Sequence, residues 1–278
     1  MGLDQRDLLR LRAIPGNRKI LFFGDSFIAG YTPPDVRIPQ LLEEKLGHST
    51  VLNLGVGGYG LDQMYLFFST LSPMVDTAHV IVGVFYNDID RCLFELREAP
   101  KPFFRVRETS LILSGVPLPS DPLQWMRQYP PPEKSYLAAA IDGLFYRVCT
   151  SRFVVERAFW LHPSETAARR PEKIAIASHL FESFREACRT RGFRLTIVLF
   201  PFKEHLVHDG WYEAFARDTL TRMGIDYVDL KPALARRVKD RHLNWWKDVY
   251  TEREHPSEEE NLVFATEIAK HLHQEFGY

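Results

Sequence analysis

Cysteine is scarce in this sequence, and the few cysteines present are far apart. The chain of 278 residues contains three of them, Cys92, Cys149 and Cys188. An odd number at wide spacing fits neither a disulfide framework nor a structural zinc site. We therefore expect three reduced thiols, as in cytoplasmic proteins.

Long hydrophobic runs and an excess of charge of one sign are also missing. The longest apolar runs, such as residues 79–85, have the length of buried strands and fall short of the roughly 18 residues of a membrane span. The N-terminal segment has no apolar stretch of the kind found in a secretory signal. The formal net charge of −1 argues against a general nucleic-acid binder. We expect a cytoplasmic protein with no membrane span and no nucleic acid as a partner.

What the sequence does contain is a series of short apolar runs that alternate with helical patterns. Runs rich in β-branched and aromatic residues occupy positions 19–23, 50–54, 80–85, 195–200 and 227–230. Helical signals mark 41–46, 61–71 and a last helix that starts at Pro256. Strands that are apolar on both faces and separated by helices are typical of a parallel sheet covered on both sides. The expected fold class is α/β, with a central parallel sheet of about five strands.

Residues 91–170 interrupt this alternation between the third and fourth predicted strands. They contain two short strand patterns within 103–116, six of the 18 prolines between Pro117 and Pro132, and an aromatic-rich helical pattern at 135–161. We interpret 1–278 as one domain, with 91–170 as an insertion at the strand ends, where open α/β sheets bind their ligands. The insertion is interpreted either as a lid or as the surface of a homodimer.

Short polar motifs follow each of the first three predicted strands. Gly24-Asp25-Ser26 follows the first, a glycine-rich stretch from Asn53 to Gly60 the second, and Asn87-Asp88 the third. A serine at the carboxyl end of a strand lies where an open α/β fold places its ligand site. Backbone N–H groups of the glycines can hold an anion, and an asparagine amide can donate to a developing oxyanion. Taken singly, each motif also has an ordinary explanation as a turn.

The glycine-rich stretch also has the spacing Gly55-x-Gly57-x-x-Gly60 of a dinucleotide-binding fingerprint. That fingerprint normally opens the first strand–helix unit, whereas here it follows the second strand. The nearest acid at the end of the next strand, Asp88, is 28 residues beyond Gly60, where about 20 are expected. Dinucleotide binding is an alternative that predicts tight binding of a nicotinamide cofactor.

A histidine precedes the last predicted helix, in the segment Glu252-Arg253-Glu254-His255-Pro256. A carboxylate three residues before a histidine can hold one ring nitrogen while the other faces outward, which is how a general base is oriented. The tetrapeptide His-Pro-Ser-Glu also occurs at 162–165, but Phe159 stands three residues before His162 and cannot orient a ring. We therefore favour His255 over His162.

Together, the four motifs resemble those of the SGNH (GDSL-type) hydrolase family. Its blocks are Gly-Asp-Ser, a glycine after the second strand, Gly-x-Asn-Asp and a C-terminal Asp-x-x-His, and counterparts occur here in the same order from Gly24 to His255. The resemblance implies a flavodoxin-like three-layer α/β/α sandwich that hydrolyses esters or thioesters without a metal or cofactor. It implies that Ser26 is the nucleophile, that His255 is the general base, and that the Ser26 N–H, Gly58 and Asn87 form the oxyanion hole.

Two positions depart from the family pattern. Phe85 replaces the glycine that begins the third block, which changes the shape of the pocket without removing the Asn87 donor. Glu252 replaces the aspartate of the last block, and glutamate, although one methylene longer, can still accept from the imidazole N–H. Glu254 and Asp248 are alternatives for this role, as is a serine–histidine dyad helped by a backbone carbonyl.

Two other patterns have a simpler explanation. His205-x-x-His208 with Asp209 has metal-ligand character, but a polar loop after the fourth strand accounts for it, and we expect no metal. The segment around Ser26 is not a Gly-x-Ser-x-Gly nucleophile elbow, because position 28 is Ile28 and not glycine. This argues against an α/β-hydrolase fold.

The predicted function is cleavage of a small-molecule carboxylic ester or thioester through an acyl-enzyme on Ser26. The family fold serves many substrates, so the acyl and alcohol parts stay open. One alternative is an acyltransferase that passes the acyl group to an alcohol or amine. Another is a module that binds an acyl group or a glycan without catalysis, which the departures at Phe85 and Glu252 would suit.

Overall fold

The central sheet has five strands, all parallel. The computed structural model describes residues 13–15, 19–96, 99–118, 121, 124, 127, 136–158, 169–251 and 254–278. The strands are β1 (Lys19–Gly24), β2 (Thr50–Gly55), β3 (His79–Phe85), β6 (Arg194–Phe200) and β7 (Asp226–Asp229). Their order in the sheet is β2-β1-β3-β6-β7. The prediction of a parallel sheet of about five strands is confirmed, and the order is that of flavodoxin-like folds.

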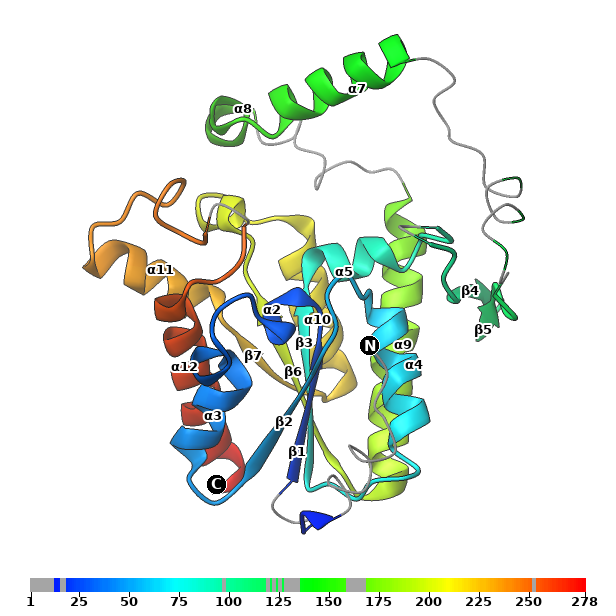
Figure 1. The fold of residues 1–278 in the computed structure, drawn as a ribbon, viewed down its shortest axis with the longest axis vertical. Helices are drawn as coiled ribbons and strands as arrows, with labels where there is room; N and C mark the ends of the chain where they lie inside the picture. Colours follow the sequence, from blue (N-terminus) through cyan, green and yellow to red (C-terminus); the bar gives the residue numbers. More distant parts are fainter. Residues whose placement is uncertain are drawn as a thin grey trace.

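Helices cover both faces of this sheet and complete three layers (Figure 1). One face carries α3 (Ile38–Leu46), α11 (Lys231–Asp240) and α12 (Glu258–Phe276). The other carries α4 (Leu61–Leu71), α9 (Arg170–Arg191) and α10 (Trp211–Met223). Two short helices, α2 (Ser26–Ala29) and α5 (Tyr86–Arg91), start at the carboxyl ends of β1 and β3. Both therefore lie at the edge of the sheet where ligand sites form in open α/β folds.

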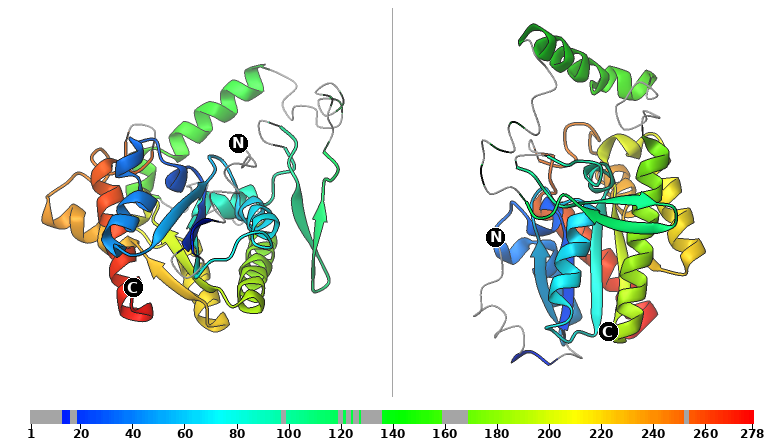
Figure 2. Two further views of the ribbon diagram at one scale, coloured as in Figure 1. Left: turned by 60° about the horizontal axis from the view of Figure 1, so that its bottom comes forward. Right: turned by 90° about the vertical axis from the view of Figure 1, so that its right-hand side faces the viewer.

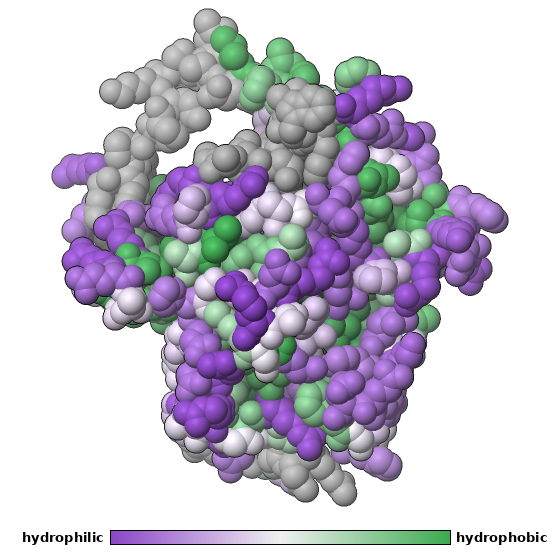
Figure 3. Space-filling view, turned by 180° about the vertical axis from the view of Figure 1, so that it is seen from behind, coloured by the Kyte–Doolittle hydropathy of each residue, from purple (hydrophilic) through white to green (hydrophobic). Residues whose placement is uncertain are grey.

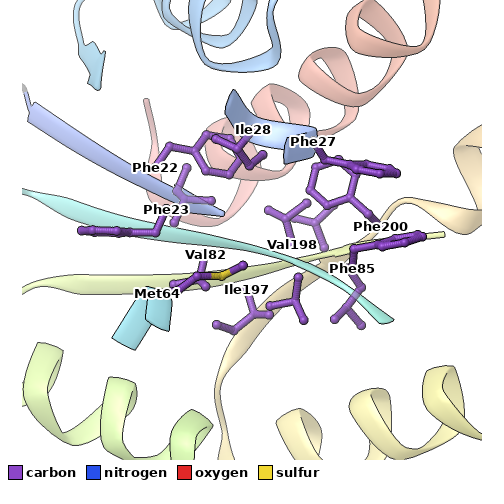
Figure 4. Close-up of a cluster of buried hydrophobic side chains, with 14 of the residues drawn as sticks. Phe22, Phe23, Phe27, Ile28, Met64, Val82, Phe85, Ile197, Val198 and Phe200 are labelled. Atoms are coloured by element: carbon purple, nitrogen blue, oxygen red, sulfur yellow. The ribbon is translucent and has the colours of Figure 1, made fainter. Parts of the chain in front are cut away.

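The central strands are buried because both of their faces are apolar. Every residue of β1 and β3 is buried, and Phe27 lies at one end of the buried apolar cluster, beside Phe85 and Phe200 (Figure 4). The Phe27 ring stacks on Phe85 at a centroid distance of 4.5 Å and meets Phe200 edge-on at 5.6 Å. Burying a side chain of this size contributes roughly 1.5–3 kcal/mol. The residue after Ser26 thus anchors the start of α2 in the hydrophobic core.

The last helix starts two residues later than the sequence prediction. α12 begins at Glu258, with Ser257 as its N-cap, and Pro256 lies before the cap. The Ser257 hydroxyl accepts from the Glu260 N–H at 3.4 Å, and the Glu260 carboxylate accepts from the Ser257 N–H at 3.0 Å. This reciprocal capping box satisfies two N–H groups at the helix start, and it explains why the helix begins after Ser257.

Residues 91–170 are described in part. β4 (Phe103–Arg107) and β5 (Ser110–Ser114) pair as an antiparallel hairpin that lies beside α9 (Figure 2). The helical pattern predicted at 135–161 contains two helices, α7 (Tyr136–Cys149) and α8 (Arg152–Arg157). The break occurs because the Ser151 hydroxyl accepts from the Val154 N–H and caps a new helix.

The surface of α7 is unusually apolar. The side chains of Leu144 and Phe145 are about two thirds exposed. Hydrophobic residues are visible at the surface at the top of the molecule, where α7 lies (Figures 1 and 3). Even so, no helix in the described ranges has both the length and the apolar character needed to cross a membrane.

Gly55, the last residue of β2, allows α2 to pack against this strand. A Cβ atom at this position would lie 2.2 Å from the Ala29 backbone nitrogen and 2.7 Å from the Ile28 carbonyl carbon. The Asn53 side chain strengthens the same contact by donating to the Ile28 carbonyl at 2.8 Å. We expect Gly55→Ala to lower the free energy of unfolding by about 3 kcal/mol, because the clash is with backbone that cannot rotate away.

Urea denaturation of the two proteins tests this expectation. Gly143→Ala is a matched control, because a Cβ at this exposed position of α7 meets nothing within 4 Å. Alanine there should raise helix stability by up to about 1 kcal/mol. Equal denaturation midpoints for Gly55→Ala and the unmodified protein would contradict the packing described here.

Candidate active site

Ser26 is the first residue of α2, directly after β1. Asp25 is the N-cap of this helix, and its carboxylate Oδ1 accepts from the Phe27 N–H at 2.8 Å. Gly24 is required before it, because a Cβ there would lie 2.2 Å from the Ile28 Cγ1 atom. The Gly-Asp-Ser motif therefore makes a sharp strand-to-helix turn that presents the Ser26 side chain at the end of the sheet.

His255 is brought into hydrogen-bond contact with Ser26 from the far end of the sequence. Its Nε2 atom lies 2.8 Å from the Ser26 Oγ, and the two residues are 229 positions apart. The loop before α12 closes on itself, because the Thr251 N–H donates to the His255 carbonyl at 2.8 Å. The imidazole packs edge-on against the Tyr31 ring at a centroid distance of 4.5 Å. The structure thus unites the two residues that sequence analysis placed at the centre of the site.

The residues considered for orienting His255 have different positions. Glu252 lies outside the described residues, as does His162. Glu254 accepts from the Lys203 Nζ at 2.5 Å. Asp248 accepts from the Asn244 N–H at 2.7 Å and so stabilises its own turn. Both alternatives to Glu252 therefore have other partners.

The glycine-rich stretch after β2 turns beside Ser26. The Tyr59 N–H donates to the Val56 carbonyl at 3.1 Å, and Gly58 within this turn has a φ of 83°. Such a φ is accessible to glycine at little cost, which explains glycine at this position. A Cβ on Gly57 would lie 3.9 Å from the Ser26 Cβ. The turn that contains Gly58 is therefore a neighbour of the serine.

Asn87 lies at the start of α5, directly after β3, and is half-buried. Within the described ranges, no hydrogen bond of its side-chain amide is found. The next residue, Asp88, is fully buried, and its Oδ2 accepts from the Phe85 N–H at 2.8 Å. Asp88 thereby fixes the first turn of the helix that carries Asn87.

Sequence reasoning missed one residue of this region, Arg91. Its Nη1 donates to Asp25 Oδ2 at 2.9 Å and to Asp88 Oδ1 at 2.6 Å. The pairing with Asp88 has a sequence signal, because the two residues are three apart on one helix. The pairing with Asp25 has none, since it depends on how the ends of β1 and β3 meet in space.

The residues with metal-ligand character are engaged in ordinary pairs. His205 is buried, and its Nδ1 lies 2.5 Å from a Glu213 carboxylate oxygen. Asp209 pairs with the Lys231 Nζ at 2.6 Å. Within the ranges that the structure describes, no three histidine, cysteine, aspartate or glutamate side chains are grouped so as to hold a metal ion.

Glu204, in the 3₁₀ helix Lys203–Leu206 after β6, is buried, and burial raises the pKa of its carboxyl from 4.5 to about 7. Between these two values the folded chain keeps a proton that the unfolded chain has lost, so stability falls as the pH rises through this window. We expect Glu204→Gln, which removes the charge, to raise the free energy of unfolding by about 3 kcal/mol at pH 8 and to change it little below pH 4.5.

Urea denaturation at both pH values measures this difference. Glu44→Gln on the exposed face of α3 serves as the control and should show no such pH-dependent gain. An equal gain for Glu204→Gln at both pH values would contradict a titrating buried carboxyl.

Comparison with known proteins yields similarity in structure only. A scan against models of known families found no match, and a comparison with curated proteins found none either. The chain is similar to LAE5, an α/β hydrolase enzyme from the metagenome of Lake Arreo, Spain, with a TM-score of 0.53 and 12% identity over 93% of this chain and 96% of that one.

Two further structures match at a comparable level. A variant of Axe2, an acetyl-xylooligosaccharide esterase from Geobacillus stearothermophilus, has a TM-score of 0.51 and 11% identity, covering 94% of this chain and 97% of that one. TesA also has a TM-score of 0.51 and 11% identity, over 91% of this chain and 97% of that one. At such identities the shared property is the fold. The predicted flavodoxin-like three-layer α/β/α sandwich is thereby confirmed, and it is the fold that this chain has in common with these proteins.

Proposed function

We propose that this protein is a serine-dependent hydrolase that cleaves a small-molecule carboxylic ester or thioester. The observation that carries the proposal is the 2.8 Å contact between the Ser26 Oγ and the His255 Nε2. A serine hydroxyl hydrogen-bonded to an imidazole at the carboxyl end of a parallel sheet is the arrangement that nucleophilic acyl transfer requires. The similarity of fold to known esterases is consistent with this chemistry.

In the proposed reaction, His255 takes the proton of the Ser26 hydroxyl as its oxygen bonds to the substrate carbonyl carbon. The negative oxygen of the tetrahedral intermediate accepts from the N–H groups of Ser26 and Gly58 and from the Asn87 amide. When the intermediate collapses, the bond to the leaving alcohol or thiol breaks, and His255 gives that group its proton. Water then attacks the acyl carbon and passes a proton to His255, and His255 returns this proton to the Ser26 Oγ as its bond to the acyl carbon breaks, which releases the acid and free Ser26.

We propose Glu252 as the group that orients His255. Its position three residues before the histidine supports this role, as do the other partners of the two alternatives. Glu254 is held by Lys203, and Asp248 by the Asn244 N–H. Holding one ring nitrogen would leave the other facing Ser26 in the tautomer that accepts a proton.

The environment of the proposed catalytic pair favours a substrate with an apolar or flat part. Phe27 and Tyr31 both contact the His255 ring, and Tyr31 is 61% exposed. An exposed ring beside the nucleophile can cover an acyl chain or the face of a sugar. Axe2, which is similar to this chain in fold, is an acetyl-xylooligosaccharide esterase, and we propose short acyl esters as the first substrates to screen.

The three cysteines, Cys92, Cys149 and Cys188, are free and buried. Free thiols suit a reducing compartment, and we propose the cytoplasm as the site of action. We also propose that the chain acts as one domain with residues 91–170 inserted at the strand ends beside the active site.

The proposed function is tested by intact mass after exposure to a fluorophosphonate. An activated serine attacks phosphorus, forms an O–P bond and expels fluoride, so the expected result is one adduct on the unmodified protein. Ser26→Ala removes the nucleophile and His255→Ala its base, and neither variant should be labelled. Ser69→Ala, a half-buried position on α4 whose hydroxyl donates to a backbone carbonyl, is the matched control and should be labelled normally. A folded but unlabelled wild-type protein would overturn the proposal.

A further inference from the structure

A single side-chain nitrogen connects the three loops that the proposed function uses. The Arg91 Nη1 donates to Asp25 Oδ2 at 2.9 Å, to Asp88 Oδ1 at 2.6 Å and to the Tyr59 carbonyl at 3.0 Å. Each partner lies directly beside a proposed site residue in the chain. Arg91 thus joins the segments that follow β1, β2 and β3.

The first of these contacts bears on the nucleophile itself. The Ser26 hydroxyl lies 2.8 Å from His255 Nε2, but it is also 3.4 Å from Asp25 Oδ2. A carboxylate oxygen is a strong acceptor and competes with the imidazole for the serine proton. Because Arg91 donates to this same oxygen, it weakens that competition and leaves the hydroxyl directed toward His255.

The other two contacts bear on the proposed oxyanion donors. Tyr59 follows Gly58, and its carbonyl accepts from Arg91. Asp88 follows Asn87 and uses one oxygen for Arg91 and the other for the Phe85 N–H. One planar, mostly buried guanidinium holds both loops and so limits their relative movement, and a misplacement of about 1 Å is enough to slow catalysis.

The surrounding structure is built around Arg91. A Cβ on Gly60 would lie 2.9 Å from the Arg91 Cβ and 3.0 Å from the Asp88 carbonyl oxygen, so glycine allows α5 to approach the end of the β2 loop. The Arg91 carbonyl accepts from the Lys101 Nζ at 3.0 Å, and Lys101 also pairs with the buried Asp62. Arg91 is therefore held between the Gly60 backbone on one side and the Lys101 side chain on the other.

The two buried carboxyl groups of Asp25 and Asp88 require a positive partner, and Arg91 is that partner. Asp25 and Asp88 are almost completely buried, and only 15% of the Arg91 side chain is exposed. Burial raises the pKa of the Asp88 carboxyl well above its usual range, and the nearby Asp25 carboxylate raises it further. Without the guanidinium, two buried carboxyl groups would face one another with no positive partner.

From these contacts we infer that Arg91 is a positioning residue, which keeps the Ser26 hydroxyl directed at His255 and holds the Gly58 and Asn87 donors in register. This inference rests on the proposed function. All three acceptors contact the same nitrogen, Nη1, so arginine differs from lysine here in its rigid planar guanidinium, which fixes the place of that nitrogen, and in a charge that it keeps when buried.

The test compares Arg91→Met, Arg91→Lys and the control Lys173→Met for hydrolysis of p-nitrophenyl acetate and for the rate of fluorophosphonate labelling. Lys173 is also a buried cation and pairs with Asp90 of α5 at 2.7 Å, but it makes none of the three contacts that Arg91 makes with Asp25, Tyr59 and Asp88. We expect Arg91→Met to lower kcat and the labelling rate about 100-fold, the effect of a misplacement of roughly 1 Å, with KM changed less than about threefold. Arg91→Lys should recover part of kcat, and Lys173→Met should lower thermal stability but leave kcat near the wild-type value.

The outcomes separate this inference from the proposed function. Wild-type protein that neither hydrolyses the ester nor is labelled would refute both. Active wild type with equal losses of kcat in Arg91→Met and Lys173→Met would overturn the inference alone, since general loosening of α5 would then explain the effect. If Arg91→Met does not fold, Gly60→Ala takes its place and should show the same fall in kcat at nearly constant KM, because its Cβ would lie 2.9 Å from the Arg91 Cβ, as well as 2.7 Å from Asp62 Oδ1, and would push α5 away from the β2 loop. Normal kcat in folded Gly60→Ala would then overturn the inference.

Discussion

Replacing His255 with alanine should lower kcat for ester hydrolysis by about four to six orders of magnitude. The imidazole is the one base within hydrogen-bond distance of the Ser26 Oγ apart from the weaker contact to Asp25, among the residues described. Without it, the serine would have to attack as a neutral hydroxyl, and the leaving group would lack an acid. Initial rates with p-nitrophenyl acetate measure the loss.

The sequence supplies an internal control for this variant. His162 stands in the same tetrapeptide, His-Pro-Ser-Glu, but has Phe159 where His255 has Glu252. His162→Ala should hydrolyse the ester at the wild-type rate. The assignment would be refuted by a loss in His162→Ala together with full activity in His255→Ala.

Asn87→Ala is expected to lower kcat by about 10²–10³, with the thermal unfolding midpoint nearly unchanged. The proposed amide donor stabilises charge that develops only in the transition state, so its loss acts on the chemical step. The fold should tolerate the change because Asn87 is half-buried, whereas the buried polar contacts of this turn belong to Asp88.

Asn87→Asp sharpens the test of Asn87. The aspartate side chain has nearly the same shape but no N–H group, and its charge would oppose an oxyanion. It should be at least as impaired as Asn87→Ala in kcat. Near-normal turnover in either folded variant would remove Asn87 from the proposed oxyanion hole.

Much of this fold can be predicted because its strands are apolar on both faces. In β3 all seven residues from His79 to Phe85 are buried, so the run stands out in the sequence without any knowledge of its neighbours. Ser26 and His255 could be predicted for another reason, since each lies in a local motif of recognisable chemistry. The contact between them could be expected only through the resemblance to a family.

Contacts between loops could not be predicted in this way. Arg91 and Asp25 are 66 residues apart, and neither residue has a pattern that refers to the other. Helix boundaries failed for a related reason: Ser257 and Ser151 cap helices through hydrogen bonds that compete with equally plausible starts nearby. The buried Glu204 likewise has no sequence signal, because its exposure depends on how several loops pack.

The position of Phe27 between Phe85 and Phe200 has a consequence for how such a protein can evolve. Tyr31 lies at the surface, so a substitution there would change the environment of His255 without disturbing the core. The position of Ser26 is more constrained, because Phe27, the next residue in the chain, is buried in the core. Under the proposed function, repacking of Phe85 or Phe200 would move the serine, so selection for turnover would extend to buried residues that never meet a substrate.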